Sequence, residues 1–131
     1  MRALFLLALL SVSTSCTKNN SDCTSIEYNK AFIAEVGEQY CVDDKNYVRI
    51  DKVDNQLCPC NADCIWEGEF IVHMSVTADG KSYEYSFGSS EKTIDEEPFD
   101  FFKLKFLSIT PNSCDSDVQK DFRVGFILEK D

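Results

Sequence analysis

Hydrophobic and polar residues alternate with a period of two along most of this chain, which is the pattern of half-buried β-strands. The alternation is clearest over residues 70–77, where Phe70 and every second residue after it are apolar. Asp79-Gly80 then supplies a tight turn, and residues 83–87 alternate again. Residues 70–87 are therefore predicted to form a β-hairpin.

The other alternating segments are short and separated by turn residues. They cover residues 32–36, 47–53, 93–94, 101–110 and 122–128. Ten Phe and five Tyr suit pleated, half-buried surfaces, and no long helical period follows the N-terminal apolar run. This spacing predicts an all-β fold, a small antiparallel β-sandwich of about seven or eight strands, stapled by disulfides.

The first 16 residues have the layout of an export signal. Arg2 is followed by an apolar run over residues 3–10 and by small residues over 11–15. That run is too short to cross a membrane, which takes about 20 residues. Because Cys16 directly follows the small residues, the arrangement resembles a bacterial lipoprotein signal, although Ser13 stands where Leu is usual. In that class the cysteine becomes the acylated N-terminus.

This interpretation divides the 131 residues into three parts. Residues 1–15 are predicted to be the signal peptide, and residues 16–25 a polar tether that starts at lipidated Cys16. Residues 26–131 form a single domain, which is the usual number for a chain of this length. The predicted location is a bacterial outer membrane, on its periplasmic or its surface side.

Cysteine number supports the lipidation of Cys16. The chain has seven cysteines, and setting Cys16 aside leaves an even number for disulfides in an oxidising compartment. The six are Cys23, Cys41, Cys58, Cys60, Cys64 and Cys114. Fifteen pairings are open to six cysteines. Cys58–Cys64 is the favoured pair, because the two residues bracket a compact loop; the partners of the other four are left open.

The cluster of Cys58, Cys60 and Cys64 has two alternative interpretations, as a metal site or as a redox centre. With His73 it offers three thiols and an imidazole to zinc, but the spacers differ from the usual two residues, and export favours disulfides. Redox catalysis typically uses a two-residue spacer at the start of a helix. We therefore predict neither a metal nor any other cofactor.

The segment around the cluster is similar to one shared by uncharacterised bacterial lipoproteins. Their pattern is Asp-Ser-Arg-Cys-Pro, then Cys-Ile/Val-Trp-x-Gly-Glu/Asn, followed by an alternating strand. The matching residues are Cys58, Pro59, Cys64, Ile65, Trp66, Gly68 and Glu69. Residues 55–57 depart from Ser-Arg, and Cys60 is additional. The resemblance implies a small secreted β-sandwich and brings no established activity.

Two residues next to the cluster have predicted roles. Gly68 is expected to let the chain turn tightly into the strand that follows it. Trp66 is expected to pack over the disulfide or to cap the edge of the core. The alternative for Trp66 is an exposed binding platform, and it is the candidate binding residue of the chain.

The charge of the chain limits its partners. Only Arg2 would leave with the signal, so the mature chain keeps all 23 acidic residues and loses one of its 13 basic ones. Nucleic acids and anionic lipid headgroups both reward clusters of Lys and Arg, and we therefore exclude them as partners of the domain. Two acidic segments, residues 95–100 and 115–121, offer carboxylates to calcium without the full pattern of a calcium-binding loop.

No catalytic residue is predicted. His73 is the only histidine, and it lies on the polar side of its strand, where it is expected to be solvated or hydrogen-bonded locally. The sequence thus predicts a membrane-anchored, non-catalytic binding module with a protein or glycan partner. The alternatives are an exported enzyme inhibitor or immunity-type protein, a calcium- or carbohydrate-binding accessory module and, least favoured, a small hydrolase.

Overall fold

The computed structural model describes residues 23–91, 93–94 and 102–130. Several expected features lie outside these residues: the signal over 1–15, lipidated Cys16, the tether as far as residue 22, and the acidic segment 95–100. Within the described part, no helix is long and apolar enough to cross a membrane.

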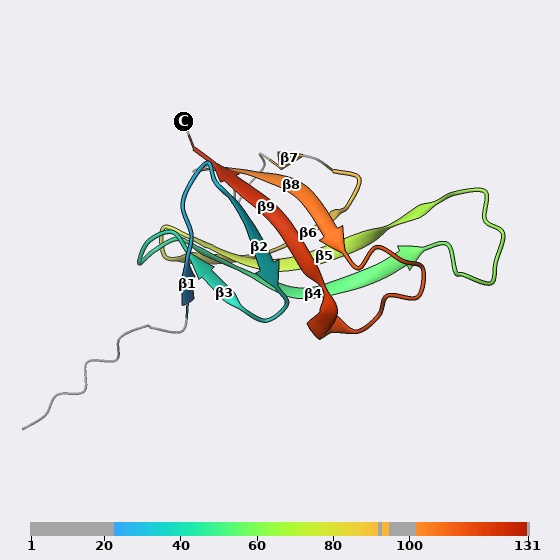
Figure 1. Ribbon diagram of the computed structural model, residues 1–131. Coiled ribbons are helices and arrows are strands. Elements are labelled where there is room, and N and C mark those ends of the chain that lie inside the picture. Colours follow the sequence, from blue (N-terminus) through green and yellow to red (C-terminus); the bar gives the residue numbers. More distant parts are fainter. Residues whose placement is uncertain (1–22, 92, 95–101, 131) are drawn as a thin grey trace, which may run out of the picture.

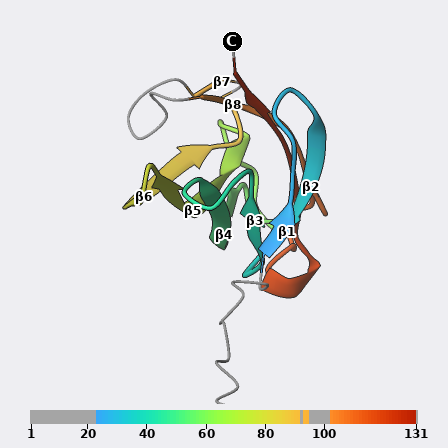
Figure 2. The same ribbon diagram turned by 90° about the vertical axis from the view of Figure 1, so that its left-hand side faces the viewer.

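The described residues form two facing β-sheets, so the predicted all-β sandwich is confirmed (Figures 1 and 2). One sheet has five strands in the order β1-β3-β4-β5-β6, and the other has four in the order β2-β9-β8-β7. The bounds are β1 Cys23–Ser25, β2 Ala31–Glu35, β3 Gln39–Cys41, β4 Tyr47–Leu57, β5 Gly68–Ala78, β6 Lys81–Gly88, β7 Thr93–Ile94, β8 Lys103–Thr110 and β9 Arg123–Glu129.

Strand β1 corrects the predicted tether over residues 16–25. Cys23–Ser25 pair in parallel with β3, and a disulfide joins Cys23 to Cys41. Three residues are too few to show an alternating pattern, so the sequence carried no sign of this strand. Residues 23–25, which the prediction assigned to the tether, therefore belong to the five-stranded sheet.

The predicted hairpin is confirmed as β5 and β6. Ala78 pairs with Lys81, and the two residues between them, Asp79 and Gly80, have φ angles of 51° and 77°. Two positive φ angles characterise the type I′ turn, whose twist matches that of the strands it joins. The sequence signal at Asp79-Gly80 was therefore sufficient to locate the turn.

A bulge keeps β4 in register with the core. The pairing with β5 shifts between Ile50 and Lys52, so Asp51 is additional. Val48 and Ile50 point into the core before the shift, and Val53 points into it after the shift. Strict alternation would have turned Val53 outward, and the extra residue restores its burial.

Phenylalanine rings join the two sheets. Phe126 of β9 is fully buried, and its ring centroid lies 5.9 Å from that of Phe87 in the opposite sheet. Phe87 also contacts Phe106, and Phe70 contacts Phe122, both edge to face. Such aromatic pairs add about 0.5–1.5 kcal/mol beyond the burial of their area.

The hairpin formed by β4 and β5 extends beyond the rest of the sandwich (Figure 1). Each strand has 11 residues, whereas β3, which flanks β4, has only three. Strand β4 ends at Leu57 and β5 begins at Gly68, and these two residues pair with each other at the base of the connecting loop.

Gly68 is required at this position for two reasons. Its φ angle is 72°, and a Cβ atom there would collide with the carbonyl oxygen of Gln56 and lie 2.8 Å from Cα of Leu57. Gly80 has a similar φ angle of 77° but open space around it. Comparing alanine substitutions at Gly80 and Gly68 therefore separates the cost of the backbone conformation from the cost of the steric collision.

We expect Gly80→Ala to lower the free energy of unfolding by about 1 kcal/mol, the cost of a left-handed backbone for alanine. Gly68→Ala adds the collision and should cost about 3 kcal/mol or more. Equilibrium urea denaturation with the disulfides intact measures both values. Equal losses in the two variants would contradict the close contact at Gly68.

Candidate functional site

The loop between β4 and β5, residues 58–67, is called the tip here. Cys58 is bonded to Cys64 within the tip, with 5.9 Å between their Cα atoms, and this is the pair that the sequence favoured. Cys60 is bonded to Cys114, with 5.3 Å between their Cα atoms. A cross-link over 54 residues removes about 4 kcal/mol of unfolded-state entropy in the chain-entropy model, and one over six residues about 2 kcal/mol.

The tip exposes two large apolar side chains side by side in the sequence. Ile65 is fully exposed, and Trp66 is 57% exposed. The expectation that Trp66 caps the edge of the core is therefore wrong, because the tip projects past the region where the two sheets face each other (Figure 1). The exposed platform, the alternative for Trp66, agrees with its position.

The indole ring of Trp66 packs against the backbone of Gly68. Cζ3 of the indole lies 2.9 Å from the position that a Cβ atom of Gly68 would occupy. One part of the ring therefore lies against the backbone, and the remainder faces solvent. The disulfides and this contact together restrict the side chain before any partner binds.

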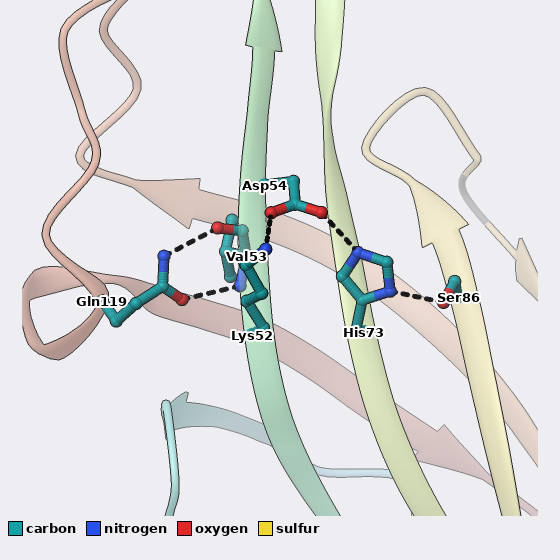
Figure 3. A network of polar contacts seen from close by, with 6 residues as sticks. All are labelled: Lys52, Val53, Asp54, His73, Ser86 and Gln119. Atoms are coloured by element: carbon teal, nitrogen blue, oxygen red, sulfur yellow. Dashed lines mark hydrogen bonds and ion pairs between the residues drawn. The ribbon is translucent and has the colours of Figure 1, made fainter.

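The connection between β8 and β9 supports the free edge of β4. The amide of Asn55 donates hydrogen bonds to the carbonyl oxygens of Ser113, Cys114 and Ser116, at 2.9–3.2 Å. Gln119, in the short 3-10 helix η2 (Gln119–Asp121), pairs with the backbone of Val53 as a neighbouring strand would (Figure 3). Its Oε1 accepts from Val53 N at 2.9 Å, and its Nε2 donates to Val53 O at 2.8 Å.

Carboxylates accompany the apolar pair of the tip. Asp63 and Glu67 are exposed in the tip, and Asp115 and Asp117 are exposed next to Cys114. Residues 58–69 and 111–118 contain no Lys or Arg. The tip therefore combines an apolar centre with negative charge.

A second group of polar residues lies on the outer face of the five-stranded sheet, the face turned away from the other sheet. Asp54, His73 and Ser86 come from β4, β5 and β6 and lie in one row (Figure 3). His73 Nε2 is 2.7 Å from Asp54 Oδ2, and His73 Nδ1 is 2.7 Å from Ser86 Oγ. This confirms that His73 is hydrogen-bonded locally.

In this row, the pKa of Asp54 is shifted from its ordinary value. The ammonium of Lys52, 2.6 Å from Oδ1, and the imidazole of His73 hold the pKa of Asp54 below its ordinary value. An ionised carboxylate only accepts hydrogen bonds, so Nε2 of His73 carries the proton between them. With a neutral ring, Nδ1 then accepts from the Ser86 hydroxyl.

These residue types are those of a serine-hydrolase triad, so the surroundings of the row decide what it can do. A triad needs a pocket beside the serine and N–H donors that converge on the developing oxyanion. Ser86 lies exposed on an open sheet face and does not line the depression found nearby. The row acts as a cross-strand polar clamp, in which each pair contributes about 0.2–1 kcal/mol.

Sequence reasoning missed this row because its members are far apart in the chain. Ser86 lies 13 residues and Asp54 lies 19 residues from His73. The register of the hairpin brings Ser86 opposite His73, and that register was readable from the turn at Asp79-Gly80. The partner on β4 depends on the bulge, which no local signal marks.

The same outer face is hollowed closer to the start of β4. This depression has a volume of about 520 Å³ and is lined by residues of β3, β4, β5 and β6. Thr77 is 5% exposed there, and its hydroxyl lies 3.1 Å from that of Ser82.

Metal ligation by the cysteine cluster is excluded by the disulfides, which use all three thiols. No group of three or more His, Cys, Asp or Glu side chains suited to a metal ion occurs within residues 23–91 and 102–130. The acidic segment 115–121 lies within these residues, whereas the segment 95–100 lies outside the described part of the chain.

Comparison with known proteins adds nothing to this geometry: no family model, no curated protein and no solved structure matches the chain.

A pH titration tests the network at Asp54. Because its folded-state pKa lies below the ordinary value, Asp54 stabilises the fold above its unfolded-state pKa, and this stabilisation is lost as the pH falls through the folded-state pKa. Lys52→Met removes the ion pair and should raise the pKa of Asp54 toward its ordinary value. Carboxyl NMR shifts followed against pH measure it.

Lys81→Met is the matched control, since Lys81 lies on the same sheet away from Asp54. It should leave the pKa of Asp54 unchanged. Equal pKa values of Asp54 in wild type and Lys52→Met would contradict the assigned role of Lys52.

Proposed function

We propose that this protein is an exported lipoprotein, anchored through Cys16 in a bacterial outer membrane, that binds a protein partner through its tip without catalysing a reaction. Three disulfides support an oxidising compartment outside the cytoplasm. The signal layout and the odd cysteine support the anchor.

The observation that carries the proposal is the exposure of Ile65 and Trp66 on a cross-linked loop. Exposed Trp is a frequent hot-spot residue, because it buries a large area at a low cost in side-chain entropy. Holding it in place beforehand reduces the ordering cost of association. Nothing in the packing of the sandwich requires two large apolar side chains at this place.

Charge specifies the partner further. An apolar pair accompanied by Asp63, Glu67, Asp115 and Asp117 is complementary to an apolar pocket with Lys or Arg at its rim. The same negative charge disfavours insertion into anionic lipid. If the partner is an enzyme, a projecting loop of this kind enters its cleft, which is the inhibitor or immunity form of the same function.

The anchor is tested by intact mass spectrometry of the mature protein purified from membranes. We expect an N-terminus at Cys16 that carries acyl chains. The matched variant Cys16→Ser should be released into the soluble fraction with its fold unchanged, because Cys16 belongs to none of the three disulfides. An unmodified Cys16 thiol in the mature wild type would overturn the anchor.

The tip is tested by site-specific photocross-linking in cells. A photoreactive amino acid in place of Ile65 should give a discrete cross-linked product. The same amino acid in place of Ile33, which is 66% exposed on β2, should not give it. Trp66→Ala should weaken binding to that product's partner by about thirtyfold, the effect of losing roughly 2 kcal/mol at a hot spot.

Ile33→Ala is the control for the binding measurement and should leave the affinity unchanged. Identical products from positions 65 and 33, or equal affinity of wild type and Trp66→Ala, would exclude the tip as the docking site.

A further inference from the structure

We propose that the depression on the outer face of the five-stranded sheet is a second binding site, for a short neutral saccharide. It shares no residue with the tip, and it goes beyond the docking of a protein partner.

Strand register brings the lining side chains to one face. Tyr47 pairs with Thr77, and Arg49 pairs with Ser75, all on the face opposite buried Val48. The remaining outward residues come from the flanking strands: Gln39 pairs with Arg49, Ser82 with Thr77, and Glu84 with Ser75. Four adjacent strands thus contribute to one hollow of about 520 Å³, within the range of about 300–1,000 Å³ usual for small-ligand sites.

The lining has the two kinds of group that a sugar needs. The amide of Gln39, the guanidinium of Arg49 and the carboxylate of Glu84 supply both donors and acceptors for hydroxyl groups. Tyr47 adds an aromatic ring, half-buried at the edge of the hollow, on which the C–H face of a sugar ring can stack.

Four polar side chains of the lining, those of Arg49, Ser75, Thr77 and Ser82, are held in place without a ligand. Arg49 Nε donates to Asp51 Oδ1 at 2.7 Å, and Ser75 Oγ donates to Asp51 Oδ2 at 2.5 Å. The hydroxyl of Thr77, on the floor of the hollow, is hydrogen-bonded to that of Ser82. Side chains fixed by such contacts lose little freedom on binding, which favours affinity.

Charge selects a neutral ligand. The positive charge of Arg49 is compensated by Asp51, and Glu84 contributes a further negative charge. A phosphate, a sulfate or a uronic acid would therefore meet no net positive charge here. Hydroxyl-rich neutral sugars match the donors and acceptors without that cost.

The test is an NMR titration of the mature chain carrying Cys16→Ser with four disaccharides: maltose, cellobiose, mannobiose and N,N′-diacetylchitobiose. At least one should shift the backbone amides of Tyr47, Ser75 and Ser82 at millimolar concentration. Tyr47→Ala should weaken that binding by about tenfold or more. Ser86→Ala, on the same face outside the depression, should bind as wild type does.

Glu84→Gln is a second variant. Because the Glu84 side chain is exposed, this substitution tests binding even if Tyr47→Ala disturbs the fold. It should also weaken binding. The proposal is overturned if no disaccharide shifts these amides, if the shifts occur at the tip instead, or if both variants bind as Ser86→Ala does. The absence of shifts, or unchanged binding in both variants, leaves the docking of a protein at the tip untouched, and Trp66→Ala tests that docking separately.

Discussion

The structure depends on how an overhanging β-hairpin is kept rigid. Strands β4 and β5 run past the sandwich, and an isolated two-stranded hairpin is at best marginally stable in water. Here the overhang is completed by side chains and cross-links. Gln119 pairs with the backbone of Val53 along its edge, the Asn55 amide donates to carbonyl oxygens of the β8–β9 connection, and Cys60–Cys114 ties the tip to that connection. The rigidity of the tip therefore derives from contacts outside the hydrophobic core.

The core itself was largely predictable from the sequence, because alternation and turn residues are local signals. The hairpin around Asp79-Gly80 is the clearest case, and the buried face of β9 is another. The bulge at Asp51 was not predictable, since it compensates for packing against residues far away in the chain. Strand β1 was missed because a parallel pairing over three residues leaves no pattern.

The candidate sites were predictable only in part. Local spacing favoured Cys58–Cys64, but Cys60–Cys114 spans 54 residues and depends on where the β8–β9 connection lies. Trp66 was expected to pack over the disulfide or to cap the edge of the core because it lies two residues after Cys64. Its exposure follows from the length of the hairpin relative to the opposite sheet, which is a property of the whole fold. The depression, too, arises only when four strands are in register.

Separating the tip from the core has a consequence for how this molecule can change. Residues 61–63 and 65–67 contribute no side chain to the buried cluster, so substitutions there leave the packing between the sheets intact. Recognition can diversify rapidly while the fold is conserved, as in the loops of antibody domains. For protein engineers, the same arrangement makes this sandwich a natural frame for displaying foreign peptides, with the four cysteines of its two staples retained as the fixed points.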